Sequence, residues 1–424
     1  MEKHSSSFIT FQTQFKSNSK GDVIEVINEI CLISKMRKII SIFIISLICF
    51  SNSIASEFYT STKTNELPED VNPDFKTLTY YAKRYSKKSK TRKGFKFIIK
   101  ASENFRKFNF NLRKDDYANQ QLKDTALLSY LVYENDTIVQ DEITPVDRFG
   151  KYFKNDTKWT SMSMGKSIIS YIAGHAICRG YISGINETLD WDIFDNTLYE
   201  GQKLINVLNM SSGSKEYKDV RGFKNSKRWV NNPTIQSIMK KELKNSRPGK
   251  NTYNYSNVDT NVVASYVLYK MGQDNFVKLL NEIFVNKVGI EHDIFLFKQE
   301  DAKKKTPSLT YAFYITRYDF LRIAVTILED WESNTCEGKY LKSLWENRIN
   351  KQQYFRNDYD GFTNPKQYGG QFHIGISGKR DTPIFIMDGF GGQTININFK
   401  DKKIISTLSV HRNYNWMKLV HEKL

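Results

Sequence analysis

The stretch WTSMSMGKSIISYIAGHAICRGY, from Trp159 to Tyr181, holds a serine and a lysine three residues apart, just before an apolar run. These two residues are Ser163 and Lys166. The run from Ile168 to Ile177 has few polar positions, which predicts a helix that is buried nearly all round and stops near Gly180. Residues three apart share a helix face, so both side chains point into one site if the helix begins at Ser163.

The Ser-x-x-Lys spacing alone is weak support for a catalytic pair, because serine and lysine are both frequent in this chain. The same pattern occurs at Ser17 and Lys20, at Ser212 and Lys215, and at Ser237 and Lys240. The pair at the start of the apolar run differs from these. A lysine in a buried helix is costly unless it is paired or deprotonated, so the placement of Lys166 favours a function for this pair.

The composition of the whole chain is that of a globular protein. It has 424 residues, of which 40% are hydrophobic and 26% charged, enough for a substantial core and for two domains. The net charge of +17 would suit a nucleic-acid-binding protein, and the densest basic run is AKRYSKKSKTRKGFK, residues 82–96. No zinc-ligand spacing or ribonucleoprotein motif accompanies it. We therefore expect no nucleic acid partner, and interpret the run as a solvated linker or a contact with an anionic cell envelope.

The first 55 residues have the features of a leader. MRKIISIFIISLICFSNSIAS, from Met36, has two basic residues, an apolar stretch over 39–50 and then small residues before Ser56. This is the order of a secretory signal peptide, and the apolar stretch is too short for a membrane span. We expect an upstream extension, a signal peptide at about 36–55, and a periplasmic or secreted protein. An uncleaved N-terminal anchor is the alternative.

Two cysteines, Cys178 and Cys336, would remain after removal of this leader. Because Cys178 lies on the predicted buried helix, we interpret it as a small core residue rather than half of a disulfide. His175 on the same helix is interpreted as a core histidine rather than a metal ligand. No clustering of cysteine and histidine in the sequence indicates a metal, and we expect no cofactor.

The order of predicted elements indicates an α+β fold. Residues 56–119 are polar and basic and suggest a partly helical N-terminal arm, followed by a main domain over 120–424. That domain begins with two predicted strands over 125–143, joined by a turn at 134–136. A mostly helical insertion follows over about 190–335, and then strands from 370 to 410 and a final amphipathic helix. These elements predict an antiparallel sheet flanked by helices, a helical lobe, and a cleft between them.

Five motifs in this main domain suggest a family. They are SMSMGKS (161–167), LINVLNMSSG (204–213), YNYSNVDTNVVASYV (253–267), ITRYDFLRIA (315–324) and DGFGGQTININFKDKKII (388–405). Their types and order resemble the serine hydrolase superfamily of beta-lactamases, penicillin-binding proteins and related esterases, in particular the class C-like branch that includes 6-aminohexanoate-dimer hydrolases. The resemblance covers about residues 125–415. It implies a beta-lactamase/transpeptidase-like fold and hydrolysis through an acyl-enzyme.

The resemblance assigns roles to residues of the first and third motifs. Ser163 would be the nucleophile, which needs a neighbouring base. Lys166 can serve if burial lowers its pKa, and Tyr255 of the Tyr-x-Asn motif is the second candidate, so the identity of the base stays open. Asn257 would hold either a substrate amide or Lys166.

The last motif would supply the second half of the site. The resemblance assigns the oxyanion donors to the backbone amides of Ser163 and Gln393. Gly391 and Gly392 could form a turn, but a better turn at 400–402 favours placing them inside or beside the strand, where substrate can approach closely. With Phe390 they stand where beta-lactamases and D,D-peptidases typically carry Lys-Thr-Gly, which helps hold a substrate carboxylate.

Phenylalanine offers no charge, so Phe390 would give the acyl pocket an apolar wall. We therefore expect a secreted hydrolase of esters or small amides with negligible penicillin turnover. A penicillin-binding D,D-peptidase acting on cell-wall peptides is one alternative. A catalytically silent binding protein on the same scaffold is the other.

Overall fold

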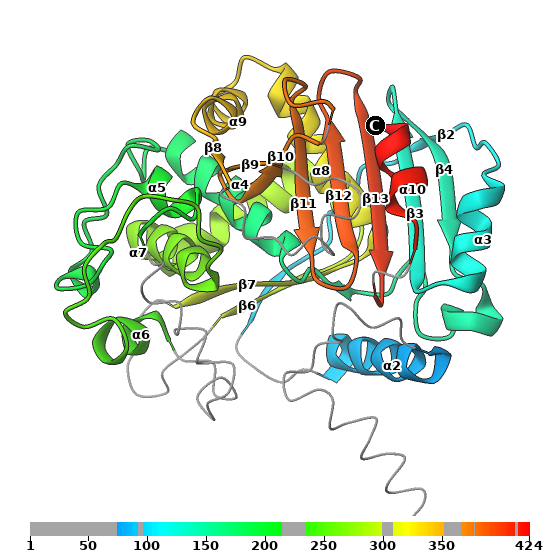
Figure 1. The fold of residues 1–424 in the computed structure, drawn as a ribbon, viewed down its shortest axis with the longest axis horizontal. Coiled ribbons are helices and arrows are strands. Elements are labelled where there is room, and N and C mark those ends of the chain that lie inside the picture. The colour runs from blue at the N-terminus through cyan, green and yellow to red at the C-terminus, as the bar shows by residue number, and fades with distance from the viewer. Residues whose placement is uncertain are drawn as a thin grey trace, which may run out of the picture. The chain divides into compact units, whose positions relative to one another are not determined.

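The described part of the chain contains two β-sheets (Figure 1). The computed structural model describes residues 74–91, 96–213, 234–298, 308–351, 366–376, 378–411 and 414–424. The predicted leader over 1–55 lies outside these residues. All of the described residues belong to one compact unit, Thr64–Leu424. Within them, no helix combines the length and the apolar character that crossing a membrane requires.

The larger sheet has nine strands, and its C-terminal strands are those predicted from the sequence. In spatial order they are β2 (Asn109–Phe110), β4 (Thr137–Ile143), β3 (Leu127–Glu134), β13 (Lys403–Ser409), β12 (Gln393–Asn398), β11 (Ile384–Gly389), β10 (Phe372–Ile374), β9 (Gln367–Gly369) and β8 (Ile349–Asn350). Only β2 and β4 run parallel. The predicted hairpin is confirmed, with Asn135 and Asp136 at positive φ in its turn.

Both faces of this sheet are packed against other parts of the chain, and its central strands are buried along their length, polar residues included. Along β3, Leu128 and Leu131 point into one core, whereas Tyr130 and Val132 point into the other. Helices α3 (Asp116–Asp124) and α10 (Trp416–Leu419) cover the second face. Helices α4 (Met164–Cys178), α8 (Arg317–Glu332) and α9 (Cys336–Glu346) lie on the first. The predicted C-terminal helix is therefore short, and a 3₁₀ turn over His421–Lys423 follows it.

The second sheet was not predicted. It has four strands in the order β1 (Lys96–Ile99), β6 (Ile294–Lys298), β7 (Leu309–Ile315) and β5 (Trp159–Thr160). Strands β6 and β7 fall in the stretch 190–335, which also contains the expected helices α5 (Leu204–Leu208), α6 (Ile235–Lys241) and α7 (Asn257–Asn281). The basic arm contributes α2 (Phe75–Thr91) and β1 to the same unit, so its described part packs against the fold.

Helix α4 is the buried helix expected from the sequence. Every residue from Met164 to Ala176 is buried. Its first turn presses on β7, since a Cβ atom on Gly165 would lie only 1.9 Å from the backbone oxygen of Tyr311. The glycine between Met164 and Lys166 is therefore required for the start of α4 to approach β7 this closely.

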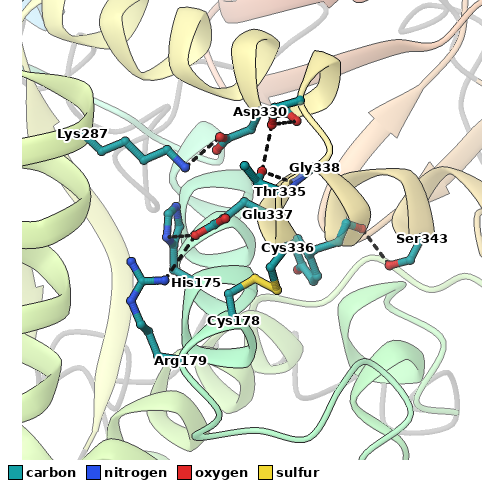
Figure 2. Close-up of a disulfide and its surroundings, with 12 residues drawn as sticks. His175, Cys178, Arg179, Lys287, Asp330, Thr335, Cys336, Glu337, Gly338 and Ser343 are labelled. Carbon is teal, nitrogen blue, oxygen red and sulfur yellow. Dashed lines mark hydrogen bonds and ion pairs between the residues drawn. A yellow bond between two sulfur atoms is a disulfide. The ribbon is translucent and has the colours of Figure 1, made fainter.

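A disulfide joins the end of α4 to the start of α9 (Figure 2). The interpretation of Cys178 as a core residue is wrong, because it is the last, half-buried residue of α4 and faces Cys336, the first residue of α9. Glu337 reinforces the junction: it forms an ion pair with Arg179 Nη1 at 3.4 Å and lies 3.2 Å from His175 Nδ1. His175 itself is buried, as expected.

Candidate active site

Ser163 lies at the point where the chain leaves β5 and enters α4. The amide of Ser161 still pairs with the carbonyl of Phe313 in β7, at 2.9 Å. Met162 then takes a positive φ of 46°, which is unusual for a residue with a side chain and turns the backbone sharply. Ser163 follows as the residue that caps α4, yet its side chain makes no capping hydrogen bond to that helix. Its half-buried hydroxyl faces Lys166 instead.

Lys166 is held at the centre of the site. Its side chain is 1% exposed, and its Nζ donates to Ser163 Oγ at 3.2 Å and to Asn257 Oδ1 at 2.8 Å. Burial lowers the pKa of this amine well below its usual value. The neutral form is therefore available to accept a proton from the serine hydroxyl.

Two tyrosine rings complete the surroundings of this amine. Its Nζ lies 3.4 Å from the ring centroid of Tyr311 and 5.0 Å from that of Tyr255. The face of an aromatic ring attracts a cation, so these rings favour the protonated form and oppose the effect of burial on the pKa. Tyr311 was missed by the sequence analysis, because it belongs to β7, a strand that was taken as part of a helical stretch.

The Tyr-x-Asn segment enters the site from the helical insertion. Ser256 caps α7 by accepting a hydrogen bond from the amide of Asp259 at 3.2 Å, which places Asn257 in the first turn of that helix. Of the two roles considered for Asn257, the structure shows the contact with Lys166. Tyr255 precedes the cap and packs edge-on against Tyr368, with ring centroids 6.4 Å apart.

The glycines of the last motif form a turn. Phe390, Gly391 and Gly392 connect β11 to β12, and the two glycines have φ values of 82° and 85°. Of the two expected placements, the glycines lie beside a strand and not inside one: they directly precede β12, and two successive residues with positive φ cannot continue an extended strand. Phe390 is half-buried in this turn. The predicted turn at 400–402 is also present, between β12 and β13.

This turn lies against the segment that carries the serine. A Cβ atom on Gly389, the last residue of β11, would lie 2.9 Å from the backbone oxygen of Ser161. Gln393 pairs with Gly389 as the first residue of β12, and its side-chain oxygen accepts the indole N–H of Trp159 at 3.0 Å. The two backbone segments predicted to supply oxyanion donors, at Ser163 and Gln393, are thus neighbours. No motif had indicated Trp159.

The fold described above is that of beta-lactamases and penicillin-binding proteins, and the predicted α+β class is confirmed. A Bacillus anthracis structure assigned as a 6-aminohexanoate-dimer hydrolase aligns with a TM-score of 0.59 and 15% identity, over 85% of this chain and 94% of its own. A penicillin binding protein from Bacillus halodurans aligns with a TM-score of 0.52 and 12% identity, over 73% and 99%. No protein-family model and no curated protein matches the chain in sequence.

Proposed function

We propose that this chain is a serine hydrolase that cleaves an ester or a small amide through an acyl-enzyme on Ser163. The contact of 3.2 Å between the buried amine of Lys166 and the Ser163 hydroxyl carries the proposal. A serine hydroxyl becomes a good nucleophile when a neighbouring base removes its proton. Burial supplies such a base, because it makes the neutral amine available at a pH where an exposed lysine is charged.

Acylation would proceed by attack of Ser163 Oγ on the substrate carbonyl carbon, with the hydroxyl proton passing to Lys166. The carbonyl oxygen becomes an oxyanion, which the amides of Ser163 and Gln393 would stabilise. Collapse of this intermediate expels the alcohol or amine, which takes up a proton from Lys166 or Tyr255. Water then attacks the acyl carbon and gives a proton to Lys166 or Tyr255. The bond from Ser163 Oγ to the acyl carbon breaks, the serine oxygen takes back that proton, and the acid is released.

Substrate selection would depend on Phe390 in the turn between β11 and β12. By the resemblance, this residue stands where beta-lactamases and D,D-peptidases have a cationic residue for the substrate carboxylate. Each lost charge-assisted hydrogen bond is worth about 1.5–3 kcal/mol, which at the upper end is about a hundredfold in rate. We therefore propose an uncharged or weakly charged acyl group, with Phe390 as an apolar wall.

Export from the cytoplasm is part of the proposal. The disulfide between Cys178 and Cys336 supports an oxidising compartment, such as the periplasm or the exterior. The signal-peptide pattern over 36–55 supports the same compartment. The mature protein should begin at or near Ser56. N-terminal sequencing of the exported protein tests this, and mature protein that starts before Met36 would contradict it.

Contact with an anionic cell envelope is proposed for the basic run over 82–96. Helix α2 supports this contact, because Tyr81 and Tyr85 are buried whereas Lys76 and Lys83 are exposed. Co-sedimentation with vesicles of anionic or of zwitterionic lipid measures it. Equal binding to both kinds of vesicle would argue against the contact.

Labelling with a fluorophosphonate probe tests the nucleophile, since only an activated serine reacts readily. The wild-type protein should be labelled and Ser163→Ala should not. Ser237→Ala is the matched control, because Ser237 and Lys240 have the same spacing on α6. An unlabelled wild-type protein would point to the silent binding protein instead.

Steady-state kinetics test the substrate class. p-Nitrophenyl butyrate should be hydrolysed with a higher kcat/KM than nitrocefin. Turnover of nitrocefin at or above the ester rate would overturn the choice of substrate. Release of D-alanine from a D-Ala-D-Ala peptide in preference to ester hydrolysis would favour the D,D-peptidase.

A further inference from the structure

A buried carboxylate lies in the first turns of α7, two residues beyond Asn257. Asp259 is fully buried. It accepts hydrogen bonds from the hydroxyl of Tyr199 at 2.5 Å and from Ser212 Oγ at 2.9 and 3.0 Å. Among the described residues, no cation donates a hydrogen bond to it. A buried carboxylate held only by neutral groups is costly, which raises the question of what it does.

The donors of these hydrogen bonds come from outside α7. Tyr199 precedes α5, and Ser212 belongs to the segment LINVLNMSSG that follows α5. In the same segment, the carbonyl of Met210 accepts the amide of Asn254 at 2.8 Å. The start of α7 and the residues before it are therefore anchored to the α5 region at two points.

The same turn of α7 is also connected to α4. Thr260 donates to the side-chain oxygen of Gln371 at 2.7 Å, and the backbone oxygen of Gln371 accepts a hydrogen bond from Ser167 at 2.7 Å. Ser167 is the neighbour of Lys166. Asp259 thus stands within the set of hydrogen bonds that places Asn257 against Lys166.

We infer that Asp259 is a positioning residue, whose hydrogen bonds with Tyr199 and Ser212 set the place of Asn257 on Lys166 and thereby the rate of acylation. This inference rests on the proposed function. The ionised carboxylate only accepts hydrogen bonds: Oδ1 accepts from Tyr199 and Ser212, and Oδ2 accepts from Ser212. A proton on Oδ2 makes that oxygen a donor, so the Ser212 hydroxyl must turn to accept from it or leave it. Protonation of Asp259 would therefore rearrange the contact with Ser212 that anchors the start of α7.

The titration of this group falls in the physiological range. Burial raises the pKa of Asp259 to about 7, and the hydrogen bonds from Tyr199 and Ser212 act in the opposite direction. Besides Tyr199, Tyr368 of β9 is a titratable group that interacts with Asp259. Burial raises the pKa of Tyr199 and of Tyr368, so both hydroxyls stay neutral. The pKa of Lys166 is lowered by its burial, so Asp259 acts through position and not through its charge on the lysine.

The test is the pH profile of fluorophosphonate labelling at Ser163. The labelling rate of the wild type should decrease as the pH is lowered through about 7, the pKa of Asp259. This decrease should be absent in Asp259→Asn. Tyr199→Phe removes one donor, which raises the pKa of Asp259 further, so the decrease should move to higher pH. Tyr340→Phe is the matched control, because it removes a buried hydroxyl that bonds to Ser170 of α4 and not to Asp259. It should leave the profile unchanged.

Kinetics on p-nitrophenyl butyrate add a second readout. In Asp259→Asn, kcat should fall about tenfold with little change in KM, because the residue does not touch substrate. Circular dichroism checks that Asp259→Asn and Tyr199→Phe are folded. If both folded variants keep the pH profile of the wild type, the inference is overturned.

A measurement without turnover separates this inference from the proposed function. In protein carrying ¹³C-labelled lysine, the Cε signal of Lys166 should shift near pH 7 in the wild type and not in Asp259→Asn. If Ser163 is not labelled but the Lys166 signal shifts near pH 7, the proposed hydrolase function is refuted. The inferred coupling between Asp259 and Lys166 would still hold in that case. Absence of the shift in the wild type would refute the coupling itself.

Discussion

Trp159 donates its indole N–H to the side-chain oxygen of Gln393 at 3.0 Å, and both side chains are fully buried. The bond joins the strand that leads into Ser163 to the strand that carries the second proposed oxyanion donor. Tyr85 of α2 packs edge-on against the same indole, with ring centroids 5.6 Å apart. The N-terminal arm therefore supports the active site directly.

Trp159→Phe should weaken this support. It removes the indole donor to the side-chain oxygen of Gln393, which still accepts the amide of Ser409 at 3.4 Å, so the loss is about 0.5–1.5 kcal/mol in free energy of unfolding. Labelling of Ser163 should also slow, because Gln393, which follows the turn from Phe390 to Gly392, loses its hydrogen bond to Trp159. Urea unfolding and the labelling rate measure the two effects. Trp191→Phe, in a stacked pair with Tyr269, is the control; equal labelling rates in the two variants would contradict the coupling.

Lys166→Met should change how stability depends on pH. The pKa of Lys166 is lower in the folded protein than its unfolded value of about 10.4, so between these two pKa values the unfolded state binds more protons. Within that pH window the free energy of unfolding of the wild type therefore increases with pH because of Lys166. Lys166→Met lacks this increase. Urea unfolding from pH 7 to 10 should show the stability of Lys166→Met relative to wild type declining as pH rises. Lys240→Met on the exposed face of α6 should show no such trend, and a flat difference for Lys166→Met would refute the lowered pKa.

Lys166→Ala and Tyr255→Phe should each slow acylation severely, and the double variant should be little slower than either one. Both residues surround one proton-transfer step, so their losses are not additive. Pre-steady-state release of p-nitrophenol measures acylation directly. Losses that multiply would show that only one of the two belongs to the proton-transfer unit.

Replacement of both Cys178 and Cys336 by serine should lower the free energy of unfolding by about 2–5 kcal/mol. The contacts of Glu337 with His175 and Arg179 would still hold the two helices together, so Ser163 should be labelled normally at temperatures where the variant is folded. A reductant should lower the Tm of the wild type and leave that of the double variant unchanged. A wild-type Tm that does not respond to reductant would argue against the bond.

The features that sequence predicted best are those encoded in short, continuous patterns. The apolar run after Ser163 defines α4, and the alternation on either side of Asn135 defines the first hairpin. The five motifs predicted the fold through their resemblance to a known superfamily, in which similar motifs occur in the same order. The grouping of Ser163 with Lys166 followed from helix periodicity alone.

The missed features depend on residues that are distant in sequence. Cys178 and Cys336 are 158 positions apart, and nothing near either one indicates the other. Tyr311 reaches Lys166 because β7 passes beside the start of α4, which local patterns do not report. The sequence did not show that Gly391 and Gly392 form a turn, because a second good turn signal lies ten residues further on.

The disulfide also fixes the covalent topology of the chain. Residues 179–335 form a closed loop between Cys178 and Cys336, and this loop contains Tyr255, Asn257 and Tyr311. A single protease cut in the part of the loop before Tyr311 would separate Ser163 from part or all of that set along the backbone. The two fragments would nevertheless remain one molecule and would migrate separately on a gel only after reduction.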